Sequence, residues 1–499
     1  MSTPQTPPSG SPASDEPAPA ATSSPPAPRN VVDRYFSITE RGSTVGTEVR
    51  GGLVTFFTMA YIIVLNPIIL GGDDSTGHQL GSKAAIAATT ALVAGVTTIL
   101  MGVWARFPLA LAAGLGINAV VAYSIATMAG MTWADAMGLV VLDGLVITLL
   151  VLTGFRRAVF DAVPPWLKTA IGVGIGLFIA FIGFVDAGFV QPSVPVVDLG
   201  QDGSLRTWPV LVFVVGLLAM IVMLVKKVRG GILWAILGGT VLSIVVEAIA
   251  KVGQYDATDP STAGGWRSTV PSWPHRVADT PDFSLVGHFS LFGAFGKIGA
   301  VTAIVLVFSL LLSDFFDTMG TMVAVGAEAG LNDEQGNPPR TKQILVVDSL
   351  AAAAGGAAGV SSNTAYVESA SGVGDGARTG LASVVTGLAF LLSTFLAPLV
   401  AVVPAEAAAP ALVVVGFLMV TGVLDIDWKR YEIAIPAFVT MVLMPFTYSI
   451  TAGIGGGVVV YVILQLATGK ARKLHPLMWL IVLLFVVYFL RGPIQAWVS

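Results

Sequence analysis

The chain has 499 residues, of which 55% are hydrophobic and only 11% are charged, against about 25% charged residues in a typical soluble domain. So few charged side chains exclude an ordinary soluble protein, and a net charge of -4 without a long basic tract gives no indication of a nucleic-acid partner. The absence of cysteine excludes disulfides, thiolate nucleophiles and cysteine-ligated metals.

The apolar residues come in blocks of about 17 to 25, the length that an α-helix needs to cross about 30 Å of hydrocarbon. Lipid offers no hydrogen-bond partners to the backbone, so membrane spans are helices or closed barrels. These blocks are too long and too uniformly apolar for barrel strands. We therefore predict an all-α integral protein of the plasma membrane, in contact with membrane lipid.

Residues 1–47 precede the first block and are expected to form a disordered cytoplasmic tail, because the first part is rich in Pro, Ala and Ser. The polar stretch that leads to Arg50 could instead fold as a helix at the membrane interface. Fourteen spans are then predicted, at 51–70, 84–104, 109–128, 133–153, 165–185, 207–226, 232–250, 299–326, 343–359, 363–376, 379–399, 408–424, 432–449 and 450–468. A further apolar stretch, 476–490, is short enough to cross the membrane or to lie in its interface.

The long polar segment 251–298 separates seven predicted spans from the next seven. Two halves with an odd number of spans insert in opposite senses, so a fold shared by both halves would be an inverted repeat. Lys and Arg gather at alternate joints between spans, and the positive-inside rule then places the N-terminus in the cytoplasm and the 251–298 linker outside.

Two predicted spans are interrupted by glycine and polar residues, and each is the third of its half. The segment LAAGLGINAVVAYS places Gly114, Gly116 and Asn118 in mid-span, and GVSSNTAYVESASGVGDG interrupts the tenth span. Extended backbone at membrane depth is tolerated only where protein or a water-filled cavity surrounds it. Paired broken spans of this kind often carry the substrate site of a transporter.

Three acidic residues lie inside predicted spans close to these breaks. Glu368 lies in the tenth span, and Asp314 and Asp317 in the eighth are three apart and so share a helix face. A charge at the bilayer centre costs about 2.5–3.5 kcal/mol, and such residues usually face a cavity and carry function. The alternative is a cap or an anchor for a neighbouring helix. Two ionised aspartates so close repel each other, and one that holds a proton would suit a proton carrier.

Other intramembrane side chains give weaker signals. Asp143 is a mid-span carboxylate, for which a structural partner is favoured over direct substrate binding. Phe315, Phe316 and Tyr366 could stack on a flat ligand, although packing is the commoner role of such residues.

The chemistry of carboxylates limits the ligand. A carboxylate accepts two parallel N–H bonds, as when Asp or Glu reads the donor edge of a base. An anion would require Arg or Lys in mid-span, and none is found there, whereas a cationic substrate or sodium stays open. The sequence has no HExxH motif and no spaced Ser/His pair, so we predict that the protein is not an enzyme.

Four segments resemble the AzgA-like adenine/guanine/hypoxanthine permeases, a family of the nucleobase-ascorbate transporter superfamily with a uracil-permease-like fold. They are FFTMAYIIVLNP (56–67), AAGLGINAVVAY (112–123), SDFFDTMGT (313–321) and TAYVESASGVGDGARTGLASVVTGL (364–388). The resemblance implies a seven-plus-seven inverted repeat with short extended segments in spans 3 and 10. It implies a core domain of residues 48–155 and 299–400 and a gate domain of residues 156–250 and 401–469, followed by a C-terminal apolar segment and tail, 470–499.

The same resemblance implies import of purine bases by proton symport, with an elevator-like movement of core against gate. It places substrate binding on Asn118, Asp314, Asp317 and Glu368, and proton coupling on the three acids, with the proton as coupling ion and neither cofactor nor metal. A xanthine, urate or uracil permease on the same fold is the nearest alternative, and a channel or anion exchanger of related architecture is a more distant one. A homodimer is compatible with the sequence, and no nucleic-acid partner is expected.

Overall fold

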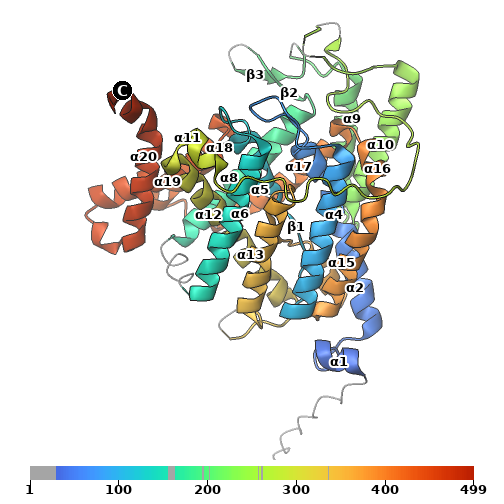
Figure 1. The fold of residues 1–499 in the computed structure, drawn as a ribbon, viewed down its shortest axis with the longest axis horizontal. Helices are drawn as coiled ribbons and strands as arrows, with labels where there is room; N and C mark the ends of the chain where they lie inside the picture. The colour runs from blue at the N-terminus through green and yellow to red at the C-terminus, as the bar shows by residue number, and fades with distance from the viewer. Residues whose placement is uncertain are drawn as a thin grey trace, which may run out of the picture.

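A bundle of α-helices with four short strands makes up the described part of the protein (Figure 1). The structure, a computed structural model, describes residues 30–498 apart from 155–162, 194–195, 202, 257, 260–261 and 335–336, and it leaves the side chains of 316, 473 and 491–498 undescribed.

The first half of the chain runs to the end of α10. Its elements are α1 (Val31–Phe36), α2 (Val45–Met59), α3 (Ile62–Ile69), α4 (Lys83–Leu100), the π-helix η1 (Met101–Ala105), β1 (Leu111–Ala113), α5 (Leu115–Ala119), the π-helix η2 (Val120–Ile125), α6 (Trp133–Thr153), α8 (Pro165–Asp186), β2 (Val190–Pro192), β3 (Val197–Leu199), α9 (Trp208–Val225) and α10 (Gly231–Ala250).

The second half follows the 251–298 linker. Its elements are α11 (Gly293–Ile298), α12 (Ala300–Glu328), α13 (Thr341–Ala357), β4 (Asn363–Ala365), α14 (Ser369–Gly374), α15 (Gly380–Ser393), η4 (Thr394–Leu396), α16 (Ala397–Ala401), α17 (Ala405–Val420), η5 (Thr421–Asp425), α18 (Tyr431–Thr447), α19 (Ile450–Ala467), η6 (Ala471–Lys473) and α20 (Pro476–Val498).

Ten helical runs among the described residues are long and apolar enough to cross a membrane, and each overlaps one of the predicted spans. The remaining four predicted spans do not form helical runs of that length, for reasons that the structure shows. Those at 109–128 and 363–376 contain the strands β1 and β4, while α13 and α18, at 343–359 and 432–449, have only 17 residues each. The count of fourteen therefore stays a prediction, as does the role of the apolar stretch 476–490 in α20.

The strands β1 and β4 pair with each other in antiparallel register, Leu111 opposite Ala365 and Ala113 opposite Asn363. All six of their residues are buried. Each extended segment thus satisfies the backbone of the other, which is what an interruption inside a membrane bundle requires. The helices α5 and α14 follow these strands and start inside the bundle.

Part of the N-terminal stretch is ordered, so the expectation of a disordered tail is wrong for residues 30–47. The helix α1 lies there, and Ile38 after it is almost fully buried. The guanidinium of Arg41 donates to the backbone oxygens of Arg106 and Arg378, at 3.1 and 3.0 Å. These hydrogen bonds tie the stretch to both halves of the chain. Residues 1–29 of the predicted tail lie outside the described residues.

The helices pack in two sets. In one set α6 packs on α13, and α2 and α4 pack on α15; in the other α8 packs on α17 and α18, and α9 on α10. Glycines bring the partners close: a Cβ on Gly144 of α6 would lie 2.3 Å from the backbone nitrogen of Ala353, and one on Gly176 of α8 would lie 2.7 Å from the oxygen of Gly416. Small residues at such crossings are typical of membrane helix pairs. The two sets contain the helices that the resemblance assigns to core and gate, and that division stays a prediction.

A direct contact joins the two sets. The hydroxyl of Tyr123, in η2, donates to Oδ2 of Asp186 at the end of α8, with an O···O distance of 3.0 Å. The ring of Tyr123 also lies edge-on to that of Tyr448, with centroids 6.0 Å apart. Any sliding of one helix set along the other has to break this contact.

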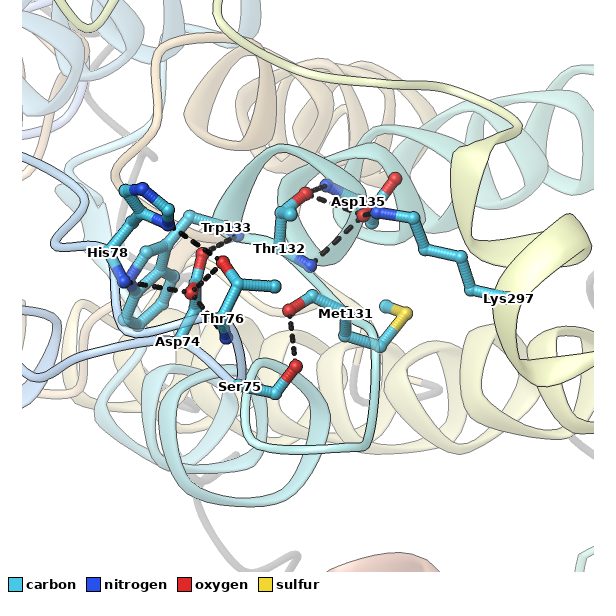
Figure 2. A network of polar contacts seen from close by, with 9 residues as sticks. All are labelled: Asp74, Ser75, Thr76, His78, Met131, Thr132, Trp133, Asp135 and Lys297. Carbon is cyan, nitrogen blue, oxygen red and sulfur yellow. Dashed lines mark hydrogen bonds and ion pairs between the residues drawn. The ribbon is translucent and has the colours of Figure 1, made fainter.

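A polar network fixes the start of α6 (Figure 2). Asp74, in the loop between α3 and α4, accepts hydrogen bonds from Thr76 and, at 3.1 Å, from the backbone nitrogen of Trp133. Asp135 closes a capping box in the first turn of α6 and forms an ion pair with Lys297 of α11. The 251–298 linker crosses this same end of the bundle, and we refer to it as the linker end (Figure 1).

Candidate functional site

Glu368 stands at the turn between β4 and α14, where it occupies the N-cap position of α14. Its Oε1 accepts a hydrogen bond from the hydroxyl of Tyr61, which lies between α2 and α3. Tyr61 is almost fully buried, whereas Glu368 is half-buried. The helix break that separates α2 from α3 therefore aims a fixed donor at a carboxylate that is itself held at a break.

Asp314 lies near the middle of α12 and is fully buried. Ser362, next to β4, donates its hydroxyl to Oδ2 of Asp314 at 2.7 Å. The other carboxylate oxygen, Oδ1, has no hydrogen-bond partner among the described residues. A buried acceptor without a donor is costly, and it is the state expected of a group that waits for a ligand or a proton.

Asp317 is exposed, one helical turn beyond Asp314. The carboxylates of Asp314 and Glu368 both act on it electrostatically. Asp317 therefore lies within electrostatic range of both other acids, and the described part of the chain places no basic side chain in an ion pair with any of the three.

Asn118, the fourth predicted site residue, is fully buried in α5, directly after β1. Its side-chain nitrogen donates to Oδ1 of Asn66 at 2.6 Å, and Asn66 donates in turn to Thr90 at 2.8 Å. The Oδ1 of Asn118 has no partner among the described residues. Among the described residues no hydrogen bond joins Asn118 to the three acids, so its contribution to a shared site stays a prediction.

The aromatic candidates are buried where they are described. The hydroxyl of Tyr366 donates to the backbone oxygen of Ala113 at 2.6 Å, which clasps the paired strands together. Phe315 packs in the main hydrophobic cluster. The side chain of Phe316 lies outside the described part of the structure. Stacking on a ligand therefore stays a prediction for all three.

Three residues that the sequence reasoning missed line this region: Tyr61, Ser362 and Asp348. Asp348 of α13 is buried and accepts a hydrogen bond from Thr318 of α12 at 2.8 Å. It could have been found by the signal that identified Asp314, because it is also a carboxylate in the middle of an apolar block. Tyr61 falls inside the first quoted motif, but a tyrosine hydroxyl in an apolar helix carries no such signal.

Asp143 departs from expectation. A structural partner was favoured for it, yet it is fully buried and neither carboxylate oxygen has a hydrogen-bond partner among the described residues. The structural partner that was favoured is therefore not found among the described residues. No group of three or more Asp, Glu or His within the described residues is arranged to hold a metal ion.

The chain is similar to known permeases over most of its length. Residues 46–456 match a permease family. The guanine/hypoxanthine permease PbuG of Bacillus subtilis is 37% identical, over 91% of this chain and 99% of its own length. The adenine permease AdeP of Escherichia coli is 36% identical, over 92% of this chain and 96% of its own. The chain is an AzgA-like permease.

Solved structures show how far the fold of this AzgA-like permease extends. The transmembrane domain of a cyanobacterial bicarbonate transporter, BicA, has a TM-score of 0.58 at 16% identity and covers 82% of this chain and 97% of its own. The transporter SLC26A9 has a TM-score of 0.56 at 11% identity, covering 88% of this chain and 67% of its own. Identities this low show the fold alone. With the apolar helices, membership of a permease family makes the chain an integral membrane transporter and not an enzyme.

Proposed function

We propose that this permease imports purine bases such as adenine, guanine or hypoxanthine across the plasma membrane by proton symport. The observation that carries the proposal is the group of three carboxylates at the crossing of α12, the strand pair and α14, unpaired with any described basic side chain. Carboxylates accept the N–H groups that a purine edge presents. The names of the relatives, which are guanine/hypoxanthine and adenine permeases, point to the same substrates.

In the proposed binding mode Glu368, oriented by Tyr61, accepts N–H groups from the base. The unpartnered Oδ1 of Asp314 and the exposed carboxylate of Asp317 complete the polar clamp. Asn118 binds a further edge after its link to Asn66 rearranges. A neutral ring is suited to this site, because an anion would be repelled by three carboxylates.

Coupling to protons follows from the same charges. Protonation of a site acid from outside reduces the mutual repulsion and lets the base bind, and proton release to the cytoplasm weakens the site again. Movement of the core against the gate then exposes the site first to the outside and then to the cytoplasm. In this orientation the N-terminus lies in the cytoplasm and the linker end outside. The distribution of Lys and Arg along the sequence supports this orientation.

Uptake of labelled hypoxanthine in cells that lack other purine carriers tests the proposal. Adenine and guanine should compete, whereas xanthine, uracil and bicarbonate should not, and acidic external pH should raise uptake while a protonophore abolishes it. Glu368→Gln and Asp314→Ala should each abolish uptake without loss of protein from the membrane, and Asp282→Asn on the exposed linker should leave it intact. Uptake that ignores the proton gradient would contradict the coupling even if the substrates are right.

A further inference from the structure

Asp143 is a carboxylate that the binding mode does not use. It lies in the interior of α6, fully buried, with no hydrogen bond to either oxygen and no ion pair among the described residues. Asp135, two turns earlier on the same helix, is also buried but is fully engaged by its capping box and by Lys297. Asp135 therefore has a structural role, whereas the described residues show no structural contact made by the carboxylate of Asp143.

The neighbours of Asp143 add negative charge and no positive charge. Asp314 of α12 and Asp348 of α13 both act on it electrostatically. Among the described residues of the packed helices, Lys297 of α11 pairs with Asp135 and Lys342 is exposed in the first turn of α13. The remaining charged groups of α12, Asp317 and Glu328, are acidic and exposed.

Burial of an ionised carboxylate without a partner costs several kcal/mol, and its proton-bound form avoids most of that cost. No group of carboxylates here is arranged for a metal ion among the described residues. The ligand that fits an isolated, donor-free carboxylate in this setting is a proton.

We propose that Asp143 is a proton-binding site of the symport, separate from the substrate clamp and contacting no substrate atom. The proposal rests on the proposed function. A proton from outside forms one O–H bond with the carboxylate and removes one negative charge that interacts with Asp314. The same O–H bond breaks when the proton leaves to the cytoplasm, and the restored charge then disfavours the bound state.

A structural route connects this charge to the substrate. Asp314 is held by Ser362 at 2.7 Å, and the backbone oxygen of Ser362 accepts a hydrogen bond from the nitrogen of Gly114 at 2.9 Å, so Asp314 is tied to both broken spans. Charges interact strongly across a low-dielectric interior. The position of α6 against α13 is fixed by the close contact at Gly144, which leaves Asp143 little room to move away.

The test uses purified protein in liposomes, as wild type, Asp143→Asn and the matched control Asp135→Asn. Three quantities are measured: exchange of labelled for unlabelled hypoxanthine, accumulation driven by a pH gradient, and hypoxanthine-dependent proton entry reported by an internal pH dye. Asp143→Asn should retain exchange and thermal stability, should carry fewer protons per hypoxanthine than wild type, and should reach a lower gradient-driven accumulation. Asp135→Asn should lose thermal stability and retain the wild-type ratio of protons to hypoxanthine.

The outcomes are distinguishable. Asp143→Asn that accumulates hypoxanthine and takes up protons like wild type overturns this inference and leaves the proposed function standing. Asp143→Asn that is missing from the membrane or unfolds at a lower temperature also overturns it, because the carboxylate would then have a structural role. Wild-type protein that carries hypoxanthine without protons contradicts the proposed symport itself.

Discussion

Replacement of Tyr61 by phenylalanine isolates a single hydrogen bond at the proposed site. The side chain is almost fully buried between α2 and α3, and its hydroxyl donates to Oε1 of Glu368. Tyr61→Phe keeps the ring and its packing and removes only this donor. The half-buried carboxylate of Glu368 then loses the side-chain donor that the described residues provide for it.

The size of the effect follows from the charge of the acceptor. A hydrogen bond to a charged group contributes about 1.5–3 kcal/mol. If the bond holds Glu368 in its binding orientation, the affinity for hypoxanthine should fall about 10- to 100-fold, since about 1.4 kcal/mol corresponds to a factor of ten. Thermal stability should change little, because the carboxylate of Glu368 can reach solvent once it is released.

Equilibrium binding of labelled hypoxanthine to purified protein measures this loss. Tyr35→Phe serves as the control, because it also loses one tyrosine hydroxyl, bonded to the backbone oxygen of Val103 at 2.9 Å, on an exposed surface. The control should bind like wild type. Wild-type affinity in Tyr61→Phe, together with loss of binding in Glu368→Gln, would refute the idea that Tyr61 orients the carboxylate.

Two further predictions concern movement and pH. In this cysteine-free chain, Tyr123→Cys with Asp186→Cys, joined by a short thiol cross-linker, should arrest uptake reversibly, because the pair connects the two helix sets. A disulfide between Thr148→Cys and Ser349→Cys, which lie within one set, should not arrest it. Uptake by protein with the first pair cross-linked would contradict the sliding movement. Burial alone would raise the pKa of the Asp74 carboxyl, but the hydrogen bonds from its own loop and from α6 outweigh burial and hold the pKa below its ordinary value. A lowered pKa in the folded state gives stability that is present above the ordinary value of about 4 and is lost as pH falls through the folded-state pKa. The melting temperature of Asp74→Asn should therefore lie below that of wild type at neutral pH and approach it in acid, and parallel curves would contradict the reasoning.

The sequence was sufficient for the helices because lipid imposes a length and a composition on each span. The positions of the broken segments were also predictable, since glycine and polar residues in an apolar block have few explanations at membrane depth. The pairing of β1 with β4 came from the resemblance only as extended segments, because three-residue strands carry no periodic signal of their own and their register depends on contacts between distant halves.

The sequence identifies the acidic residues of the proposed site, but it does not predict their burial or their hydrogen-bond partners. Positions three apart on a helix differ by about 60° in direction at 3.6 residues per turn, which is enough for Asp314 to be buried while Asp317 is exposed. Hydrogen-bond partners such as Tyr61 and Ser362 come from other segments, and nothing local marks them. That Asp143 has no hydrogen-bond partner among the described residues is a property of the packed bundle and could not be inferred from its own helix.

A structure of the purified protein with hypoxanthine bound tests the central claim most directly. The account predicts one purine ring between Glu368 and Asp314, with an N–H group of the ring within hydrogen-bond distance of the Glu368 carboxylate. A ring bound elsewhere, or one that leaves both carboxylates without contact to the ligand, would contradict it.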